Sequence, residues 1–510
     1  MTHSCRRICS PSECVGPQVD PVVNVLRAHC LLVSATRRLL VEVPPGVFVT
    51  GRGLSRRPSC RKRIVRVRTS DMCLPPGSTS NAAAAQDHPN RSTDSQASTA
   101  WASQEPIHTW RTALPEPKEP LKPFSLWQAL KDLIGKDILD APLPIGQYCP
   151  LTELQFRAEE LEYTELLDQA AALPKGSIDR LLLVAAFSQI GFSAGLRPYK
   201  CLNPVMGETF EVVRPEKNMR AVMEAVHQDF RGTTRIINAW HAEGARWELS
   251  GEDEPRVRFW GSSVDIHLNW TDVLTFHDGD RYSWRKGTSN ISGLISGNLV
   301  ITHKGILSIT GHTSGATVHL TFKEPGMFSS KKAVKHEMTG VVEMDGKRLA
   351  APTISGQFDQ KLVATLEDGC QRVLWEKRYP PGGLGRCQFS EWTAHLNDIP
   401  QGLHKRLPPT DARLRPDVRA LDNGCYDKAA ELKRELTGRM RARTLEAAKS
   451  GSPLQPRWFA LADPAALTAN VITEQRYRLR GLLESTGRHE GMAAGQMLRI
   501  LCIAEAGSNM

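Results

Sequence analysis

The most extensive pattern in the chain is an alternation of apolar and polar residues between positions 205 and 375. Three stretches show it most clearly: Val318, Leu320 and Phe322; Ile266, Leu268 and Trp270; and Leu362, Ala364 and Leu366. Such alternation is typical of β-strands that turn one face to a core. The pairs Asp278-Gly279, Asp345-Gly346 and Asp368-Gly369 favour tight hairpin turns between the stretches. Many short strands joined in this way predict one large antiparallel sheet or barrel.

Apolar residues recur at helical spacing on both sides of this region. Residues 125–140 begin with Ser125, a good N-cap with Gln128 three positions later. The apolar side chains that follow are Leu126, Trp127, Leu130, Leu133 and Ile134. Residues 150–190 predict two further helices, and the segment from Asp427 to Glu446 predicts a strongly charged helix. The order along the chain is therefore helical, then strand-rich, then helical.

The ends of the chain lack a clear period. Residues 1–75 hold thirteen Arg or Lys against four Asp or Glu, so they carry nearly all of the formal charge of +10. Two interpretations compete: an organelle transit peptide, and a disordered basic tail or even untranslated sequence. The composition favours the tail. Residues 76–121 predict a low-complexity linker, with order beginning near residue 122, and residues 466–510 predict a weakly patterned tail.

Composition and motif content favour binding over catalysis. The twelve Cys form no C-x-x-C pair, and the fifteen His show no H-E-x-x-H spacing, so we expect neither a metal site nor a cofactor. The sequence holds no P-loop and no G-x-S-x-G nucleophile elbow, and we expect no catalytic residues and no enzyme. The basic charge lies outside the predicted fold and does not indicate nucleic-acid binding.

The segment 200–211, KCLNPVMGETFE, joins the helical part to the strand part. Pro204 and Gly207 favour a tight turn, beside the charges of Lys200 and Glu208. A turn that offers backbone N–H groups next to a lysine is a candidate anion cradle, although a plain structural turn is the commoner outcome.

This segment resembles the KPFNPLLGETFE pattern of the oxysterol-binding protein family. Further resemblances follow in the family's order: residues 125–140, 150–167, 240–244 (WHAEG), 407–417 (LPPTDARLRPD) and 456–459 (PRWF). Together they assign residues 122–465 to the family's lipid-binding domain. The resemblance implies a mainly β fold with α: a nearly closed antiparallel β-barrel around an apolar tunnel, over about 200–400. A helical lid at 125–140 and C-terminal helices at about 415–450 complete it.

The resemblance also implies a function. Family members hold a sterol in the tunnel, many hold phosphatidylinositol 4-phosphate instead, and exchange of the two drives transfer between membranes. The expected ligands and partners are therefore a sterol, phosphatidylinositol 4-phosphate and anionic membrane surfaces, with protein partners unknown. A cytoplasmic, peripheral location at intracellular membranes is implied, endoplasmic-reticulum contact sites included. The alternative is a sterol sensor or scaffold that binds lipid without net transfer.

Matched position by position, the family pattern gives a set of headgroup-binding residues: Lys200, Leu202, Asn203, Glu208, His227, Lys433 and Arg441. The family places an acid four residues after the lysine of the last helix, where this chain has Thr437, so a supporting salt bridge is expected to be lost. Cys201 stands where the family has Pro and is expected to loosen the turn.

The family signature EQVSHHPP is broken here. The stretch 224–237 reads EAVHQDFRGTTRII, with neither the His pair nor the Pro pair. Only His227 offers an imidazole. Three explanations remain open: a sterol carrier that has lost phosphoinositide binding, substitution of the histidines by Arg231 or Arg235, or an error in the gene model.

Overall fold

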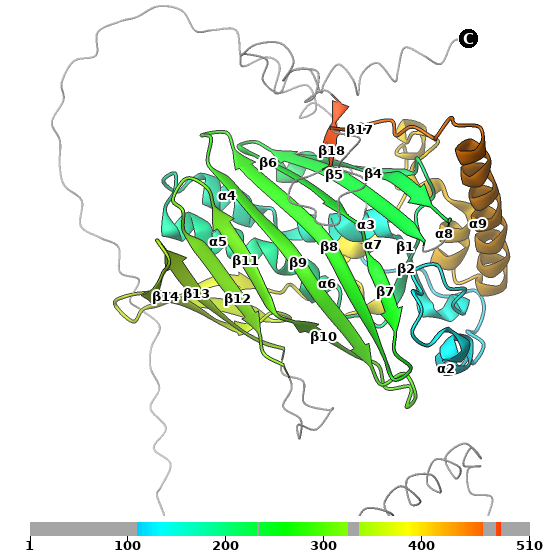
Figure 1. The fold of residues 1–510 in the computed structure, drawn as a ribbon, viewed down its shortest axis with the longest axis horizontal. Helices are drawn as coiled ribbons and strands as arrows, with labels where there is room; N and C mark the ends of the chain where they lie inside the picture. The colour runs from blue at the N-terminus through cyan, green and yellow to red at the C-terminus, as the bar shows by residue number, and fades with distance from the viewer. Residues whose placement is uncertain (1–109, 232–233, 325–335, 463–475, 481–510) are drawn as a thin grey trace, which may run out of the picture. The chain divides into compact units, whose positions relative to one another are not determined.

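The computed structural model describes residues 110–231, 234–324, 336–462 and 476–480. The predictions for residues 1–75 and for most of the linker and tail lie outside these ranges. Within them, a 14-stranded antiparallel sheet dominates (Figure 1). Its strands are β3 (Thr209–Arg214), β4 (Met219–Asp229), β5 (Arg235–Gly244), β6 (Trp247–Asp253), β7 (Arg256–Phe259), β8 (Ser263–Phe276), β9 (Arg281–Ser292), β10 (Val300–Lys304), β11 (Ile306–Gly311), β12 (Thr317–Phe322), β13 (Glu337–Met344), β14 (Lys347–Gln357), β15 (Lys361–Thr365) and β16 (Gln371–Glu376).

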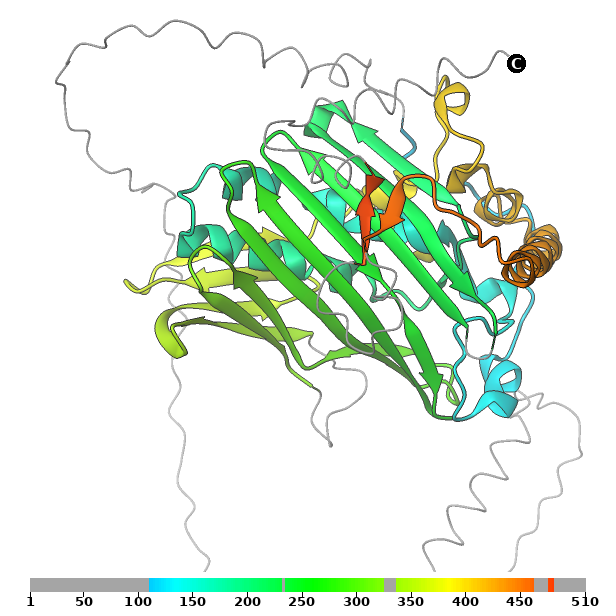
Figure 2. The same ribbon diagram turned by 45° about the horizontal axis from the view of Figure 1, so that its top comes forward.

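The sheet runs β16-β15-β14-β13-β12-β11-β9-β8-β6-β5-β4-β3, with β10 paired to β9 and β7 paired to β8. It curls strongly, as Figure 2 shows, and its two edges, β16 and β3, are not paired with each other among the described residues. The predicted nearly closed barrel is therefore confirmed, with an open seam. The predicted hairpins are confirmed too: Asp345 and Gly346 join β13 to β14 with φ of 52° and 71°, the conformation that favours Asp-Gly.

Helices fill the inside of the curled sheet. They are α3 (Glu153–Arg157), α4 (Glu165–Ala171), α5 (Ile178–Ser188) and α6 (Ile190–Ala194). Every residue of α5 from Arg180 to Ser188 is buried, and the helix packs on β11, β12 and β16. One large apolar cluster joins these helices to the inward side chains of the strands. The predicted helix at 150–167 is shorter than expected, because Tyr148–Thr152 forms strand β1, which pairs with β2 (Lys200–Leu202).

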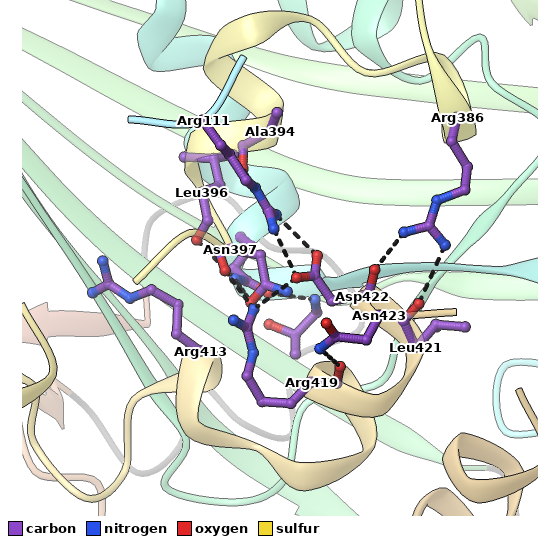
Figure 3. A network of polar contacts seen from close by, with 12 residues as sticks. Arg111, Arg386, Ala394, Leu396, Asn397, Arg413, Arg419, Leu421, Asp422 and Asn423 are labelled. Atoms are coloured by element: carbon purple, nitrogen blue, oxygen red, sulfur yellow. Dashed lines mark hydrogen bonds and ion pairs between the residues drawn. The ribbon is translucent and has the colours of Figure 1, made fainter. Parts of the chain in front are cut away.

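Order begins earlier than residue 122, contrary to our expectation. Arg111 donates two parallel hydrogen bonds, of 2.7 and 2.9 Å, to the carboxylate of Asp422 (Figure 3), and its Nε donates to the carbonyl of Ala394. Trp110 stacks on His395. These contacts reach segments almost 300 residues away, so composition alone could not indicate them.

The lid, residues 125–140, starts as predicted and then departs from the prediction. Ser125 caps α2 (Leu126–Leu130) by accepting from the Gln128 amide, which confirms the N-cap. The helix ends at Leu130, and a 3₁₀ turn covers Lys131–Leu133. Ile134, the last of the apolar residues that repeat at helical spacing, is 51% exposed. The next part of the lid is held to β7, because the N–H groups of Gly135 and Ile138 donate to the carbonyls of Phe259 and Val257 in that strand.

Three α-helices, the first of them α7 (Glu391–His395), and a small hairpin follow the sheet among the described residues. Helix α8 (Pro416–Asp422) packs against α9 (Tyr426–Lys449), which confirms the predicted charged helix. Strands β17 (Phe459–Leu461) and β18 (Tyr477–Leu479) pair and cover the outer face of β4 and β5. Strand β18 lies inside the expected unpatterned tail, because three residues are too few to show a period. None of the described helices is long and apolar enough to span a membrane.

Candidate functional site

An apolar cavity of about 220 Å³ lies between the lid and the sheet. The strand walls contribute Val264, Ile266, Leu268 and Trp270 from β8, with Ile291 and Ile301 from β9 and β10. The alternation read from the sequence is confirmed here, since Ile266, Leu268 and Trp270 share the inward face. Lid residues Leu126, Leu130, Ile138 and Leu139 close the other side. Water forms few hydrogen bonds in such a space. An apolar ligand that enters it is stabilised by about 25 cal/mol for each Å² of its apolar surface that is removed from water.

The inner end of the cavity is polar. Lys286 on β9 forms an ion pair with Glu160, and Arg157 forms one with Asp253; all four groups are buried. Burial lowers the pKa of Lys286 well below its usual range. His303 on β10 stands nearby, where its Nε2 lies 3.0 Å from the Phe192 carbonyl and its Nδ1 2.8 Å from Ser289 Oγ. These groups can orient the polar end of an amphiphile whose body fills the apolar part.

A second, smaller hollow opens beside the first, and we call it the mouth hollow. It is lined by Asp140, Tyr148, Leu202, Asn203, Pro204, Val205, Gln228, Phe230, Ile236, Arg415, Lys433, Thr437 and Met440. The predicted residues Leu202, Asn203 and Lys433 therefore come together. Lys433, Thr437 and Met440 all project from α9, at the spacing of one helix face.

Two lysines flank the ring of Tyr148 in this region. Lys433 Nζ lies 4.7 Å and Lys200 Nζ 5.8 Å from the ring centre. Burial, with the Lys200 ammonium second, lowers the pKa of Lys433. Lys433 has no ion-pair partner among the described residues, while Lys200 donates to Asn203 Oδ1 and lies 3.8 Å from Glu153. The mouth hollow thus holds a half-buried cation that forms no ion pair among the described residues, and the carboxylates of Asp140 and Asp417 act on it only from beyond ion-pair distance.

Glu208 has a different place from the one implied by the family pattern. It is 2% exposed, and its Oε2 lies 2.7 Å from Arg415 and accepts from the Val205 amide. Arg415 also donates to the Asn203 carbonyl and pairs with Asp417. Through these buried contacts Glu208 stabilises the turn at 203–208, and it does not line the mouth hollow. Gly207, with φ of 78°, confirms the predicted tight turn.

Arg441 lies at the rim and has a carboxylate partner. Its guanidinium pairs with Asp140 of the lid and lies 5.2 Å from the Phe230 ring. The salt bridge that we expected to be lost with Thr437 is thus supplied from the lid. Cys201 lies in strand β2, not in the turn, with its Sγ 3.7 Å from that of Cys149, so it does not loosen the turn as expected.

His227 lies apart from the other predicted residues. The pairing of β4 with β5 skips Val226, so that Ala225 faces Asn238 and His227 faces Ile237. Opposed residues share one face of a sheet, and Ile237 belongs to the outer cluster under β17. His227 lines a separate hollow with Arg231 and Thr444, while Gln228 takes the place on the mouth side. Burial, with Arg235 second, lowers the pKa of His227.

The two arginines considered as substitutes are occupied elsewhere. Arg231 pairs with Asp229 at 2.9 Å, and Arg235 pairs with Glu254 at 2.7 Å. Neither lines the mouth hollow. The replacement of the missing histidines by Arg231 or Arg235 is therefore not what this structure shows.

Among the mouth-hollow residues that sequence reasoning missed are three polar ones that bear on the site: Asp140, Tyr148 and Arg415. Asp140 and Tyr148 fall in segments without a charge or turn pattern. Arg415 lies in the LPPTDARLRPD stretch, which the sequence marked only as a resemblance. No spacing rule connects these positions, because they meet through tertiary contacts.

Comparison with known proteins agrees with the geometry. The family model described as oxysterol-binding protein matches residues 125–482, past the expected domain end at 465. The chain is 37% identical over 357 residues to oxysterol-binding protein-related protein 2B of Arabidopsis thaliana, covering 68% of this chain and 50% of that protein. It spans about half the length of the first curated relatives that it matches.

Two solved structures have similar folds. The Osh1 ORD domain in complex with ergosterol has a TM-score of 0.65 at 27% identity, covering 76% of this chain and 92% of that one. The Osh3 ORD in complex with PI(4)P from Saccharomyces cerevisiae has a TM-score of 0.59 at 28% identity, covering 70% and 91%. From the family match over residues 125–482, this chain belongs to the oxysterol-binding protein family.

Proposed function

We propose that this protein binds a sterol in the apolar cavity and carries it between intracellular membranes. The observation that supports this most directly is the cavity itself, which has apolar walls on β8 and β9, a polar inner end and a lid. The Osh1 ORD domain, similar in fold, was solved with ergosterol. Binding and release of a lipid need no covalent chemistry, and we assign the protein no catalytic role.

We further propose that phosphatidylinositol 4-phosphate is the alternative ligand, with its headgroup in the mouth hollow. Lys433, half-buried and without an ion pair among the described residues, is the main argument, because a phosphate would give it a direct charge-assisted contact. Asn203 and Leu202 line the same hollow, and Arg441 lies at its rim. Lys200 lines the neighbouring apolar cavity, where it donates to Asn203 and lies 5.8 Å from the Tyr148 ring centre. His227 and Glu208 are left out of this set, since they lie on other faces. The Osh3 ORD was solved with PI(4)P.

The domain limits and the location are part of the proposal. We propose that the lipid-binding domain starts by residue 110, where Arg111 is anchored, and extends to β18. We propose that the protein works at intracellular membrane surfaces, with anionic lipid as its partner. Attraction of the basic segment 1–75 to such a surface would contribute on the order of 1 kcal/mol per well-placed Arg or Lys.

The test is a transfer assay with the full chain. Donor liposomes carry a fluorescent sterol, acceptor liposomes carry phosphatidylinositol 4-phosphate, and movement of each lipid is followed separately. Lys200→Ala is run beside the wild type. Exchange of both lipids, with only the phosphoinositide affected in the variant, supports the proposal.

Sterol transfer without phosphoinositide transfer would remove the counter-lipid from the proposal. Sterol binding without any transfer would favour the alternative, a sterol sensor or scaffold. Failure to bind either lipid would contradict the proposed function.

A further inference from the structure

Asp140 brings a carboxylate into a hollow otherwise lined by cations and neutral groups. It is the last residue of the lid, and its side chain is 14% exposed. Arg441 of α9 forms an ion pair with it, and Asn203 Nδ2 lies 3.5 Å from its Oδ1. The same Asn203 Nδ2 donates to the Leu139 carbonyl at 3.2 Å. The end of the lid is therefore tied to two residues of the proposed headgroup site.

Asp140 also stands where the two hollows meet. Ile138 and Leu139 line the apolar cavity, and the next residue, Asp140, lines the mouth hollow. The rest of the lid is held by backbone hydrogen bonds to Phe259 and Val257 and by apolar packing. A change in the contacts of Asp140 in the mouth hollow can thus directly affect Ile138 and Leu139 in the wall of the apolar cavity.

A phosphate that enters the mouth hollow needs the groups that Asp140 holds. Arg441 and Asn203 are hydrogen-bond donors suited to an anion, and both are engaged by the lid. A carboxylate beside a bound phosphate would repel it, because like charges a few ångströms apart are unfavourable. Binding therefore requires Asp140 to give up these contacts.

We propose that Asp140 is an internal counter-ion, and that an anionic lipid headgroup displaces it from Arg441 and Asn203. This inference rests on the headgroup site proposed above. Its displacement frees the C-terminal end of the lid over the apolar cavity. Headgroup binding and lid opening are in this way coupled through one ion pair, and Asp140 sets the affinity for the anionic ligand.

The experiment compares the wild type with Asp140→Asn, using the full chain and a short-chain phosphatidylinositol 4-phosphate as probe. Asp132→Asn is the matched control, because Asp132 lies exposed in the same lid. Asp140→Asn should bind the probe about fivefold more tightly, as expected for loss of a partly exposed like charge. Asp132→Asn should bind as the wild type does.

Amide hydrogen exchange of residues 126–140 tests the lid separately. Without ligand, Asp140→Asn and Arg441→Gln should both exchange faster than the wild type, and the probe should speed exchange in the wild type only. Unchanged affinity and unchanged lid exchange in Asp140→Asn, with a wild type that binds the probe, would overturn the inference and leave the proposed function intact. If neither protein binds the probe, the proposed headgroup site fails, and this inference fails with it.

Discussion

The ammonium of Lys433 lies 4.7 Å from the centre of the Tyr148 ring, in a hollow that also holds Asn203 and Leu202. A half-buried cation over an aromatic face is stabilised by the ring, but only in part. A bound phosphate would stabilise the ammonium further, so the proposed headgroup site depends most on Lys433.

Replacing Lys433 should separate the two ligands. In Lys433→Ala, extraction of phosphatidylinositol 4-phosphate from liposomes should fall about tenfold or more, because a charge-assisted hydrogen bond contributes about 1.5–3 kcal/mol. Sterol extraction should stay within about twofold of the wild type. Lys428→Ala is the matched control, since Lys428 is exposed on the same helix and pairs with Glu431. Equal loss of both lipids would argue against a separate headgroup site.

Filling the cavity should block the sterol alone. Leu268→Trp adds volume to the inward face of β8, so sterol binding should fall by about tenfold or more, with a destabilisation of about 1–3 kcal/mol. The control is His267→Trp, one residue away on an exposed position. Binding of a fluorescent sterol and a urea unfolding curve provide the two measurements. Normal sterol binding by Leu268→Trp would place the ligand elsewhere.

Glu208 should behave as a structural residue. Glu208→Gln weakens the buried contact with Arg415, so the free energy of unfolding should fall by about 2 kcal/mol. Binding of both lipids per folded molecule should be unchanged. Glu216→Gln provides the comparison, because Glu216 is half-exposed and its contact with Arg214 is 3.6 Å. A selective loss of phosphoinositide binding in Glu208→Gln would return this residue to the headgroup set.

His303 should make the fold sensitive to acid. Burial lowers the pKa of His303 to about 4, below the ordinary value of 6.5. The unfolded chain then binds a proton between these values while the folded chain does not, so stability is lost as the pH falls from 6.5 to 4. The contribution is at most about 3 kcal/mol. In His303→Gln this part of the pH dependence should disappear.

Urea unfolding at several pH values between 4 and 7 measures the effect. His277→Gln serves as the control, because His277 is exposed. The pH profile of this control should follow that of the wild type. An identical pH profile for His303→Gln and the wild type would show that His303 does not titrate between pH 4 and 6.5 on unfolding.

Local patterns in the sequence determined much of the fold. The alternation at 264–270 and 318–322, the Asp-Gly turns, the Ser125 cap and the charged α9 helix were all predictable. Each depends on interactions within a few residues: the pleat of a strand, the conformation of a turn, or the period of a helix. The family resemblance then predicted an apolar lipid-binding cavity between these elements.

Tertiary structure alone decided the composition of the site. Tyr148, Arg415 and Asp140 meet Lys433 only because β1, the start of α8, the lid and α9 converge. Val226 is left out of the pairing between β4 and β5, and this shift of one residue exchanges the two faces of the strand. His227 therefore lies on the outer face. Helix α2 ends at Leu130, before the apolar repeat ends at Ile134, and Ile134 lies exposed beyond it. Long-range contacts and a single register shift leave no local pattern, so the sequence by itself could not reveal them.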